Sequence, residues 1–395
     1  NFAKYLRRAG YEPVIFCTNS KHGQQELFFD NKDLWHEHIA EEIATPFVFV
    51  KARTYQGNGK QRVLNMIDFY RNVKKSAKQY AKEHGTPDII YASSVHPLTL
   101  IAGIQLAKYF GIKCICEVRD LWPESIVAYS KRFTKNYPLI KILYQGEKWI
   151  YKKADSLIFT MEGAYDYIVD QGWEQEISRS KVYYINNGVD LEVFHYNREH
   201  FEVEDDELLN PNLFTVVYTG TLVTSNNIDG MLDFAKRLQK YPDVRLLIWG
   251  NGECTESMLL RIRNEHIDNI CYKGVVDKKY IPYIVSRANI NLMHAAPTSL
   301  YRYGASPNKL FDYLAAGRQI LQDFTYNQDI VQRYRCGISC DWNLEKMMEA
   351  FETLYHANSE EKCAMCRGAE QGAADYDFEN LTKKLIFVIE RIPQK

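Results

Sequence analysis

Short apolar runs alternate with amphipathic stretches along most of the chain. In the first half these runs are PVIFCTN, FVFVKA, DIIYASS, KCICEV, SLIFT and KVYYINN, each bounded by turn residues. Between them, apolar residues recur at helical spacing over residues 62–84, 98–109 and 138–153. Strands that alternate with helices in this way are typical of a parallel sheet with helices on both faces.

The pattern is interrupted by the polar, acidic segment NREHFEVEDDELLNPN, which begins after Phe194. It resumes with FTVVYTG, VRLLIWG, NICYKG, INLMHA and RQILQD as strands. We therefore predict an α/β protein with two doubly wound, Rossmann-like domains facing a cleft, over residues 1–196 and 197–374. In such sheets ligands bind beyond the carboxyl ends of the strands, so the loops that follow strands are expected to carry the function.

The beginning of the chain departs from this pattern. Residues 1–10 (NFAKYLRRAG) have the apolar spacing of a helix that ends at Gly10, and they lead into a strand at 14–17. An α/β domain of this kind normally begins with a strand. We therefore expect the first strand and its loop to be missing from this sequence.

Composition and charge narrow the class of protein. Of the 395 residues, 46% are apolar and 13% aromatic, which excludes a disordered chain. The formal net charge is -1, but residues 1–194 carry +4 and the remainder carries -5. The overall balance argues against a nucleic-acid partner. The positive charge of the first domain is still compatible with binding to an anionic surface.

The nine cysteines are odd in number and scattered, which favours a reducing cytosol over a disulfide framework. Cys363 and Cys366 form a CxxC near Cys336 and Cys340, so a zinc site is conceivable. The segment SEEKCAMCRGAEQG is better explained as a helix, and we predict no metal site. No apolar run is long enough for a membrane span and no signal peptide is visible, so we expect a cytoplasmic protein.

The strongest local motif is GASPNKLFDYLAAG in the second domain. A proline directly after Ser306 predicts a helix with Ser306 as its N-cap and the proline at the first helical position. Asn308 and Lys309 then lie in the first turn, where free N–H groups and the helix dipole attract a phosphate or diphosphate. Asp312, one turn further, is placed to accept hydrogen bonds from ribose hydroxyls. The alternative is a well-capped structural helix.

Two glycine loops follow strands of the same domain, in YTGTLVTSNN and in WGNGE. Glycine lets a ligand approach the backbone closely, and hydroxyl and amide side chains can bind phosphate oxygens. Without a GxGxxG or Walker motif, each loop alone is a weak signal. The ligand-contact candidates in and near these loops are Gly220, Thr221, Asn226, Gly250, Asn251 and Val275.

In the first domain, polar side chains follow two strands, in YASSVHP and in EVRDLWPES. The candidates are Ser94, His96, Arg119, Asp120, Trp122 and Glu124. Charged groups after a buried strand are costly unless they are paired or used. An internal ion pair of Arg119 with Asp120 or Glu124 is the structural alternative, and His96 could simply cap the next helix.

The blocks EVRDLWPES, INNGVDLEVF, YTGTL and SPNKLFDYLAAG together resemble the retaining glycosyltransferases of family 4, which have the GT-B fold. The resemblance runs through nearly the whole chain. YQGNGKQRVLNM also resembles the WbuB-like N-acetyl-fucosamine transferases of O-antigen and capsule assembly. The resemblance implies that the second domain binds a nucleoside-diphosphate sugar, usually UDP-linked, that the first domain receives the acceptor, and that a helix within 375–395 crosses back onto the first domain.

Carried over residue by residue, the resemblance assigns ribose binding to Asp312, which matches the second acid of the family's E-x7-E motif, whereas Gly304 replaces the first acid. The family's basic pair is missing from TLVTSNN, so Lys309 is expected to supply the positive charge. The family's His–Asp pair appears here as Arg119 and Asp120. Lys309, Arg119 and Asp120 are therefore the expected catalytic residues, with Ser94, His96, Trp122 and Glu124 on the acceptor side and Ser306, Asn308 and the loop residues above on the donor side.

The family reaction retains the anomeric configuration, commonly through front-face attack in which the departing diphosphate takes the acceptor proton. The protein's main task is then to stabilise the charge that grows on the diphosphate. The nucleoside-diphosphate sugar is a co-substrate, and we expect neither a cofactor nor a metal ion.

The expected acceptor is a glycan or a polyprenyl-diphosphate-linked sugar. Residues 131–153 hold seven basic residues and one acid, interleaved with aromatic and aliphatic side chains. Such a stretch suits an anionic membrane surface, here the inner face of the cytoplasmic membrane. The alternative is an ordinary core-packed helix with a solvated lysine face.

Two other classes of protein remain open. A UDP-GlcNAc 2-epimerase would share the fold, but it needs several cleft carboxylates and a His–Gly–Glu loop that this sequence lacks. A non-catalytic nucleotide-sugar-binding protein is the second, because Gly304 replaces an expected acid.

Overall fold

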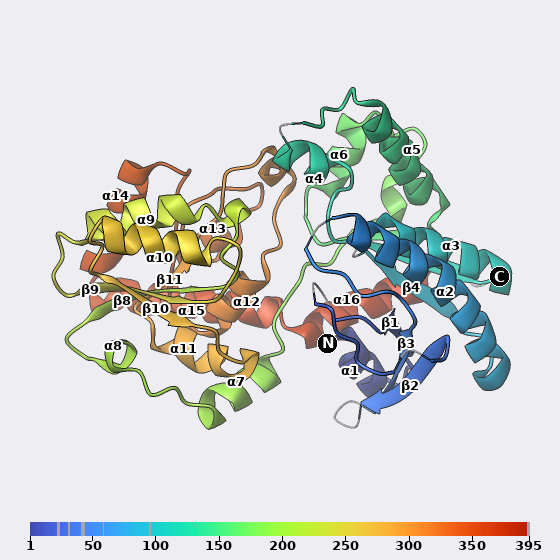
Figure 1. The fold of residues 1–395 in the computed structure, drawn as a ribbon, viewed down its shortest axis with the longest axis horizontal. Coiled ribbons are helices and arrows are strands. Elements are labelled where there is room, and N and C mark those ends of the chain that lie inside the picture. The colour runs from blue at the N-terminus through green and yellow to red at the C-terminus, as the bar shows by residue number, and fades with distance from the viewer. Residues whose placement is uncertain are drawn as a thin grey trace. The chain divides into compact units, whose positions relative to one another are not determined.

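The computed structural model describes residues 1–21, 24–30, 32–40, 44–57, 59–94, 96–130 and 132–392. The chain divides into two compact units (Figure 1): unit 1 is Asn1–Ile185 with Leu381–Lys395, and unit 2 is Asn186–Asn380. The last helix, α16 (Phe378–Arg391), begins in unit 2 and ends in unit 1. The division after Ile185 precedes the boundary that the sequence analysis placed after residue 196.

The described strands of unit 1 form two sheets. The first has the order β1 (Ile15–Thr18), β3 (Thr45–Val50), β2 (Trp35–Ala40), and the second the order β4 (Ile89–Ser93), β5 (Lys113–Val118), β6 (Ser156–Phe159), β7 (Val182–Tyr184). All neighbours run parallel except β2 and β3, which are antiparallel. The hydrophobicity pattern did not predict β2, because its sequence WHEHIA is largely polar and lies at the edge of its sheet.

Helices cover these strands. They are α1 (Phe2–Arg8), α2 (Lys60–His84), α3 (Pro97–Phe110), α4 (Glu124–Tyr129), α5 (Pro138–Lys153), α6 (Ala164–Asp170) and the 3-10 turn η1 (Arg179–Lys181). Glycine at position 103 explains how closely α3 packs on β4, because a Cβ atom there would lie 2.6 Å from the Cβ of Ala92. α3 also packs against α2 and α5 (Figure 1), so these three helices form one side of unit 1.

Unit 2 is built on a parallel six-stranded sheet. Its order is β10 (Ile270–Gly274), β9 (Val244–Trp249), β8 (Phe214–Thr219), β11 (Ile290–Met293), β12 (Gln319–Gln322), β13 (Gly337–Ser339). The chain moves outward in one direction from β8 to β10 and in the other from β11 to β13. The strand order therefore reverses between β8 and β11, and the carboxyl ends of these strands are where such sheets bind ligands.

The described helices and turns of unit 2 are α7 (Leu191–His200), α8 (Asp206–Leu209), η2 (Thr224–Asn226), α9 (Ile228–Leu238), α10 (Thr255–Asn264), η3 (Lys278–Tyr280), α11 (Ile281–Arg287), η4 (Ser299–Tyr303), α12 (Asn308–Ala315), α13 (Ile330–Tyr334), α14 (Leu344–His356) and α15 (Ser359–Asp375). The main core packs α9 and α14 on the sheet, with Phe234 and Phe351 fully buried between them. Such a core fixes the strand ends that carry the candidate site.

Two expectations about the whole chain can be compared with these elements. All nine cysteines are free, and Cys363 and Cys366 lie within α15, as the helical interpretation of that segment predicted. Among the described residues, no helix combines the length and the apolar content that a bilayer span requires.

Candidate functional site

Lys309 stands at the point of unit 2 where the strand order reverses. The first turn of α12 carries its side chain to the carboxyl end of β8, where Nζ donates a hydrogen bond to the Tyr218 hydroxyl at 3.0 Å. The ammonium also lies 4.1 Å from the centre of the Tyr218 ring. The predicted cation is therefore located at the end of the predicted strand.

Glycines 220 and 250 let two loops meet beside this cation. Both have positive φ angles, +148° and +150°. A Cβ atom at Gly220 would lie 2.9 Å from Lys309 Nζ, and one at Gly250 would lie 1.8 Å from the carbonyl oxygen of Gly220. Only glycine fits these two positions without displacing the cation or the neighbouring backbone.

The remaining loop candidates hold the loops in shape. Asn226 donates from Nδ2 to the carbonyl oxygen of Thr221 at 2.7 Å and to its Oγ1 at 3.2 Å. The Tyr218 hydroxyl donates to the same carbonyl at 3.1 Å. Asn251 accepts at Oδ1 from the Gly252 amide at 2.8 Å, and Val275, after β10, is 67% exposed. Thr221 and Asn226, both expected to contact a ligand, thus bind each other.

The ammonium of Lys309 is electrostatically unsatisfied. Burial lowers the pKa of Lys309 to about 7, and the opposing attraction of Asp323 only partly offsets this. Lys309 forms no ion pair with a carboxylate in the described part of the chain. A half-buried cation in this state gains most from an anion that a ligand brings.

Asp312 lies one turn further along α12. Burial raises the pKa of this carboxyl to about 6, while the positive charge of Lys278 opposes the shift. The next residue, Tyr313, accepts at its hydroxyl from the backbone N–H of Thr219 at 3.0 Å. α12 is thereby tied to the loop that follows β8, and a carboxyl and an ammonium are both placed on its first turns.

The prediction that Ser306 caps this helix is wrong. α12 begins at Asn308 with Pro307 in the N-cap position, and no side chain caps it. The Ser306 hydroxyl instead donates to Asn186 Oδ1 and accepts from the backbone N–H of Asn187 at 3.2 Å. Pro307 is extended (ψ 120°), so the chain turns into the helix one residue later, and Asn308 is exposed at its start.

Sequence reasoning missed a buried pair at the ends of β11 and β12. His294 and Asp323 are fully buried and bonded to each other through Nδ1 and a carboxylate oxygen. His294 Nε2 bonds the carbonyl oxygen of Asn227 at 2.6 Å, and Asn227 has a left-handed φ of 47°. Both residues stand at the ends of predicted strands, in INLMHA and RQILQD, and directly follow the observed β11 and β12, which is the signal that could have identified them.

In unit 1 the loops after β4, β5 and β6 are bonded to one another. Ser94 Oγ accepts from the backbone N–H of Arg119 at 3.0 Å, and Thr160 Oγ1 donates to the carbonyl oxygen of Arg119 at 3.1 Å. These bonds hold the backbone of Arg119 while its side chain is exposed. The structure thus brings Ser94 and Arg119 together, as their positions after neighbouring strands predicted.

His96 and Asp120 lie in a shared electrostatic environment. His96 occupies the N-cap of α3 without a capping hydrogen bond from its side chain, and its buried Nδ1 has no partner among the described residues. Burial, aided by the charge of Arg62, lowers the pKa of His96 to about 4. Burial raises the pKa of Asp120, while Arg119 and Arg62 oppose that shift.

Glu124 is part of the internal structure of unit 1. It is 5% exposed, accepts from the Tyr144 hydroxyl and forms an ion pair with Lys135 at 3.0 Å. The sequence left open an ion pair between Arg119 and Glu124. Glu124 instead pairs with Lys135. Trp122 is half-buried in the same loop. In the described residues, no group of three or more His, Cys, Asp or Glu side chains is placed to hold a metal ion.

Two protein-family models match this chain, and the boundary between them lies close to the boundary between the two structural units. Residues 1–193 match the protein-family model described as Glycosyltransferase Family 4, and residues 200–367 match the one described as Glycosyl transferases group 1. A Bacillus subtilis protein, TuaH, which is named as a glycosyltransferase of teichuronic acid biosynthesis, is 28% identical over 224 residues. That match spans 54% of this chain and 51% of TuaH, so the chain matches about half the length of this relative.

Solved structures are similar over most of the chain. Sucrose-phosphate synthase from Thermosynechococcus elongatus has a TM-score of 0.71 at 15% identity, covering 99% of this chain and 91% of that protein. HepE from Anabaena, solved in complex with UDP-glucose, has a TM-score of 0.63 at 11% identity, covering 89% and 87%. Together with the parallel sheets, these likenesses confirm the predicted α/β fold class, GT-B.

Proposed function

The chain is built of a glycosyltransferase family 4 domain followed by a glycosyl transferases group 1 domain, and we propose that it transfers a sugar from a nucleoside-diphosphate donor. The observation that carries this proposal is the position of Lys309. Its ammonium lies at the strand-order reversal of unit 2 and has no carboxylate partner in the described residues. UDP is the proposed nucleotide, since the similar HepE structure contains UDP-glucose.

The donor roles follow from the chemistry of each group. Lys309 and the amides at the start of α12 bind the diphosphate, because an ammonium and free N–H groups offer complementary charge. Gly220 and Gly250 let the diphosphate approach the backbone. Asp312 accepts hydrogen bonds from the ribose hydroxyls once its carboxyl is ionised. Charge that develops on the leaving diphosphate is then stabilised without reorganisation of the site.

The finer features of the reaction are part of the same proposal. Transfer retains the anomeric configuration and needs no metal ion, with Arg119 and Asp120 contributing from unit 1. Ser94, His96 and Trp122 lie on the acceptor side, and the sugar is an N-acetylated hexose or a 6-deoxyhexose. The proposal is supported by the motif resemblance and by the bonded loop ends of unit 1.

We assign the acceptor to surface polysaccharide assembly, as a glycan or a polyprenyl-diphosphate-linked sugar. The name of the relative TuaH supports this class. Peripheral association with the inner face of the cytoplasmic membrane through residues 131–153 fits such an acceptor, and α5 exposes Leu139, Ile142 and Trp149 to solvent. Lys131 lies outside the described residues.

A two-step assay tests the proposal. A thermal-shift screen of nucleoside-diphosphate sugars identifies the donor, and transfer of its labelled sugar to a polyprenyl-diphosphate-linked acceptor is then followed with and without a chelator. Transfer to the acceptor, unaffected by the chelator, is the expected result. Interconversion of UDP-sugars would favour an epimerase, and donor binding without transfer or slow hydrolysis would favour a binding protein; either result would overturn the proposal.

A further inference from the structure

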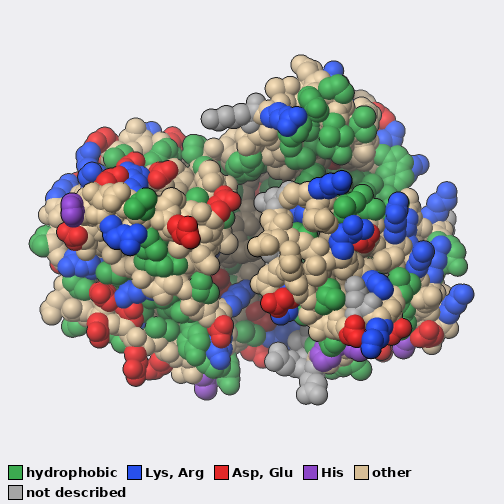
Figure 2. Space-filling view, in the orientation of Figure 1, with side chains coloured by type: hydrophobic (Ala, Val, Ile, Leu, Met, Phe, Trp, Pro, Cys, Tyr) green, Lys and Arg blue, Asp and Glu red, His purple; other side chains and the backbone are tan. Residues whose placement is uncertain are grey.

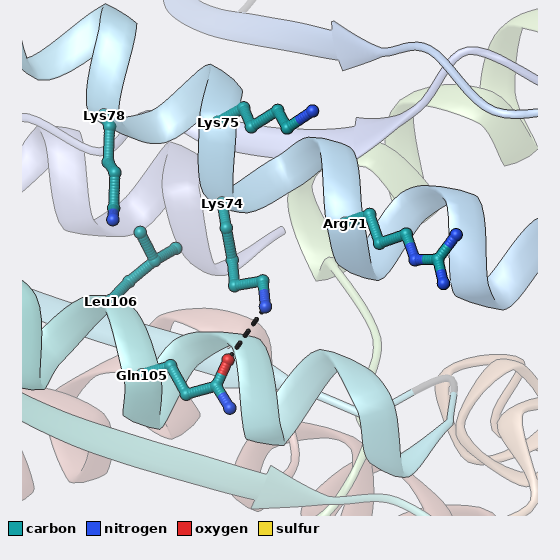
Figure 3. A pocket seen from close by; sticks show the side chains of 6 residues that line it. All are labelled: Arg71, Lys74, Lys75, Lys78, Gln105 and Leu106. Atoms are coloured by element: carbon teal, nitrogen blue, oxygen red, sulfur yellow. Dashed lines mark hydrogen bonds between the residues drawn. The ribbon is translucent and has the colours of Figure 1, made fainter.

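His294 and Asp323 form a buried polar pair to which the proposed function gives no role. Figure 2 shows charged side chains over the visible faces of both units, where water screens their interactions. The bond from Lys74 to Gln105 between α2 and α3, at 3.0 Å, is one such exposed contact (Figure 3). The side chains of His294 and Asp323 are fully buried instead, so their polar atoms need partners within the protein.

Both ring nitrogens of His294 face oxygen atoms. Nδ1 is bonded to a carboxylate oxygen of Asp323, and Nε2 lies 2.6 Å from the carbonyl oxygen of Asn227. A carbonyl oxygen only accepts, so Nε2 carries a proton and donates it. A second proton lies between Nδ1 and the carboxyl group, because two lone pairs would otherwise face each other. The pair is therefore neutral overall and directs an N–H of the ring at Asn227.

Asp323 also fixes the backbone that carries His294. Its other carboxylate oxygen accepts from the backbone N–H of Ala295 at 3.3 Å, and its own N–H donates to the carbonyl oxygen of Met293 at 3.2 Å. The ring of Trp342 packs edge-on against His294, with 5.4 Å between the ring centres. The imidazole is thus held from two strand ends and cannot turn away without breaking buried hydrogen bonds.

The segment that His294 reaches is the far end of the glycine loop that follows β8. Asn227 is the N-cap residue of α9, and its carbonyl oxygen also accepts from the backbone N–H of Met231 at 3.2 Å. Two residues beyond His294, the N–H of Ala296 donates to the carbonyl oxygen of Ser225 at 2.9 Å. The segment after β11 therefore binds two carbonyl groups of this loop.

The near end of the same loop lies beside Lys309. The Tyr218 hydroxyl, which accepts from Lys309, donates to the carbonyl oxygen of Thr221, and Asn226 donates to the same oxygen at 2.7 Å. The bonds to Thr221 lie within residues 218–227, whereas the bond from His294 ties the loop to the neighbouring strand. The far end is thus held by groups that need not contact a ligand.

We propose that His294 and Asp323 are positioning residues for the donor, which hold residues 220–227 in the conformation that presents Gly220 and Thr221 to the diphosphate beside Lys309. A buried pair of this kind adds little net stability, because desolvation offsets its attraction. The geometry that it imposes explains it better, since a loop that is already formed binds a ligand without further ordering. The inference deepens the proposed function and rests on it for the identity of the donor.

A double substitution separates positioning from stability. His294→Leu with Asp323→Val replaces both partners by apolar side chains, which is often neutral or stabilising for a buried pair, so the melting temperature should not fall. UDP should bind about tenfold more weakly in calorimetry, because the apparent affinity falls with the fraction of chains in which the loop is correctly formed. A purely structural role would lower the melting temperature and leave the UDP affinity of the folded protein unchanged.

Asp323→Asn is the conservative variant. Its amide nitrogen can donate to Nδ1 of His294 while its oxygen still accepts from Ala295, so Nε2 keeps its proton and its bond to Asn227. We therefore expect UDP affinity to stay within about threefold of the wild type, since no hydrogen bond of the pair is lost. The comparison is made at pH 6, below the pKa of about 7 of Lys309, because the charge of Asp323 favours the protonated form of that lysine.

Asn269→Leu is the matched control. Asn269 is buried and donates from Nδ2 to the carbonyl oxygen of Ala235 at 2.8 Å, near the other end of α9. This variant removes a buried contact to the same helix without touching the loop. The melting temperature should fall, since a buried carbonyl group loses its partner, while UDP affinity should not change.

Hydrogen exchange without nucleotide reports on the loop directly. Amides of residues 221–227 should exchange faster in the double variant than in the wild type, and at the wild-type rate in Asp323→Asn and Asn269→Leu. Wild-type UDP affinity in the folded double variant would overturn the inference, as would a tenfold loss in Asp323→Asn or in Asn269→Leu. If the wild type itself bound no UDP, the proposed function would fail, whereas unchanged exchange in the double variant would refute the positioning pair alone.

Discussion

Two carboxylates near strand ends of unit 1 and one ammonium near a strand end of unit 2 are satisfied in opposite ways. In unit 1 the buried carboxylates of Glu117 and Glu124 already have their partners, a serine hydroxyl for the first and a tyrosine hydroxyl with a lysine for the second. In unit 2 the ammonium of Lys309 has the Tyr218 hydroxyl but no carboxylate partner in the described residues. A cation kept in this state favours an incoming anion, whereas a satisfied carboxylate stabilises the fold.

Glu147 extends the comparison within unit 1. Its carboxyl accepts from the hydroxyls of Tyr151 at 2.7 Å and Tyr167 at 2.6 Å, and burial raises its pKa to about 8. The group is therefore protonated and neutral at pH 7. The buried carboxyl of Glu147 is thus part of the structure of unit 1. Substitution of Glu147 should change stability, whereas substitutions around Lys309 should change donor binding and transfer.

The largest expected effect is that of Lys309→Met. Because this change removes a charge that stabilises the leaving diphosphate, we expect kcat to fall by about 10²- to 10³-fold. The melting temperature should not fall, since a buried ammonium is itself costly. Steady-state transfer and thermal denaturation measure the two effects. Lys240→Met, at an exposed lysine paired with Glu352, is the control and should retain full activity. Similar rates for both variants would contradict the role of Lys309 in transfer.

Gly220→Ala tests whether donor binding needs the close approach of the loop to Lys309. The new Cβ would lie 2.9 Å from Lys309 Nζ at a φ of +148°, so the ammonium or the loop must shift. Strain of this kind costs about 1–3 kcal/mol, and we expect UDP affinity in calorimetry to fall about 10- to 100-fold. Gly146→Ala, where nothing lies within 4 Å of the added atom, should leave UDP affinity unchanged. An unaltered affinity in Gly220→Ala would show that the close approach is not needed.

The pH dependence of donor binding sharpens the comparison further. Asp312, with a pKa of about 6, ionises as the pH rises, and Lys309, with a pKa of about 7, then loses its proton. UDP-glucose, whose diphosphate does not titrate in this range, should therefore bind best between pH 6 and 7. Asp312→Asn should weaken binding at pH 6.5 about tenfold and abolish the acidic limb of the profile. A flat wild-type profile in calorimetry would contradict both assignments.

The smallest expected effect on donor binding is that of Glu147→Gln, which should change stability alone. The folded-state pKa of Glu147 is about 8 and the ordinary value is 4.5, so the folded chain binds the extra proton between these values. Stability of the wild type relative to the glutamine variant should therefore be greatest below about pH 4.5, decline as the pH rises, and level off above 8. Denaturant titrations at several pH values measure this difference. UDP affinity should be the same in both proteins, and a loss of binding in the variant would link unit 1's buried acid to the donor site.

Much of the fold and part of the candidate site could be predicted from sequence. The alternation of apolar runs indicated the parallel strands, and helix α5 was predicted with its observed bounds. Lys309 and Gly220 were identified because a cation on a first helical turn and a glycine after a strand each have a local signature. Their mutual contact was not predictable, since they lie far apart in the sequence.

The errors arise from contacts between distant segments. Ser306 has the local signature of an N-cap, but its hydroxyl finds Asn186 and Asn187, about 120 residues earlier. His294 and Asp323 look unremarkable until two strand ends bring them together. Within residues 131–153, Lys135 pairs with Glu124, and Lys148 and Lys152 share the carboxylate of Glu176, and the sequence does not show these contacts.

Hydrogen exchange with and without UDP tests the central claim most directly, because it reports where the nucleotide binds without requiring the acceptor. UDP should slow amide exchange in residues 218–227, 249–255 and 306–315 of unit 2, and this protection should disappear in Lys309→Met. Exchange in α5 and around Glu147 should not change. UDP binding that leaves these three segments unprotected, or that persists unchanged in Lys309→Met, would contradict the assignment of Lys309 and its glycine loops as the donor site.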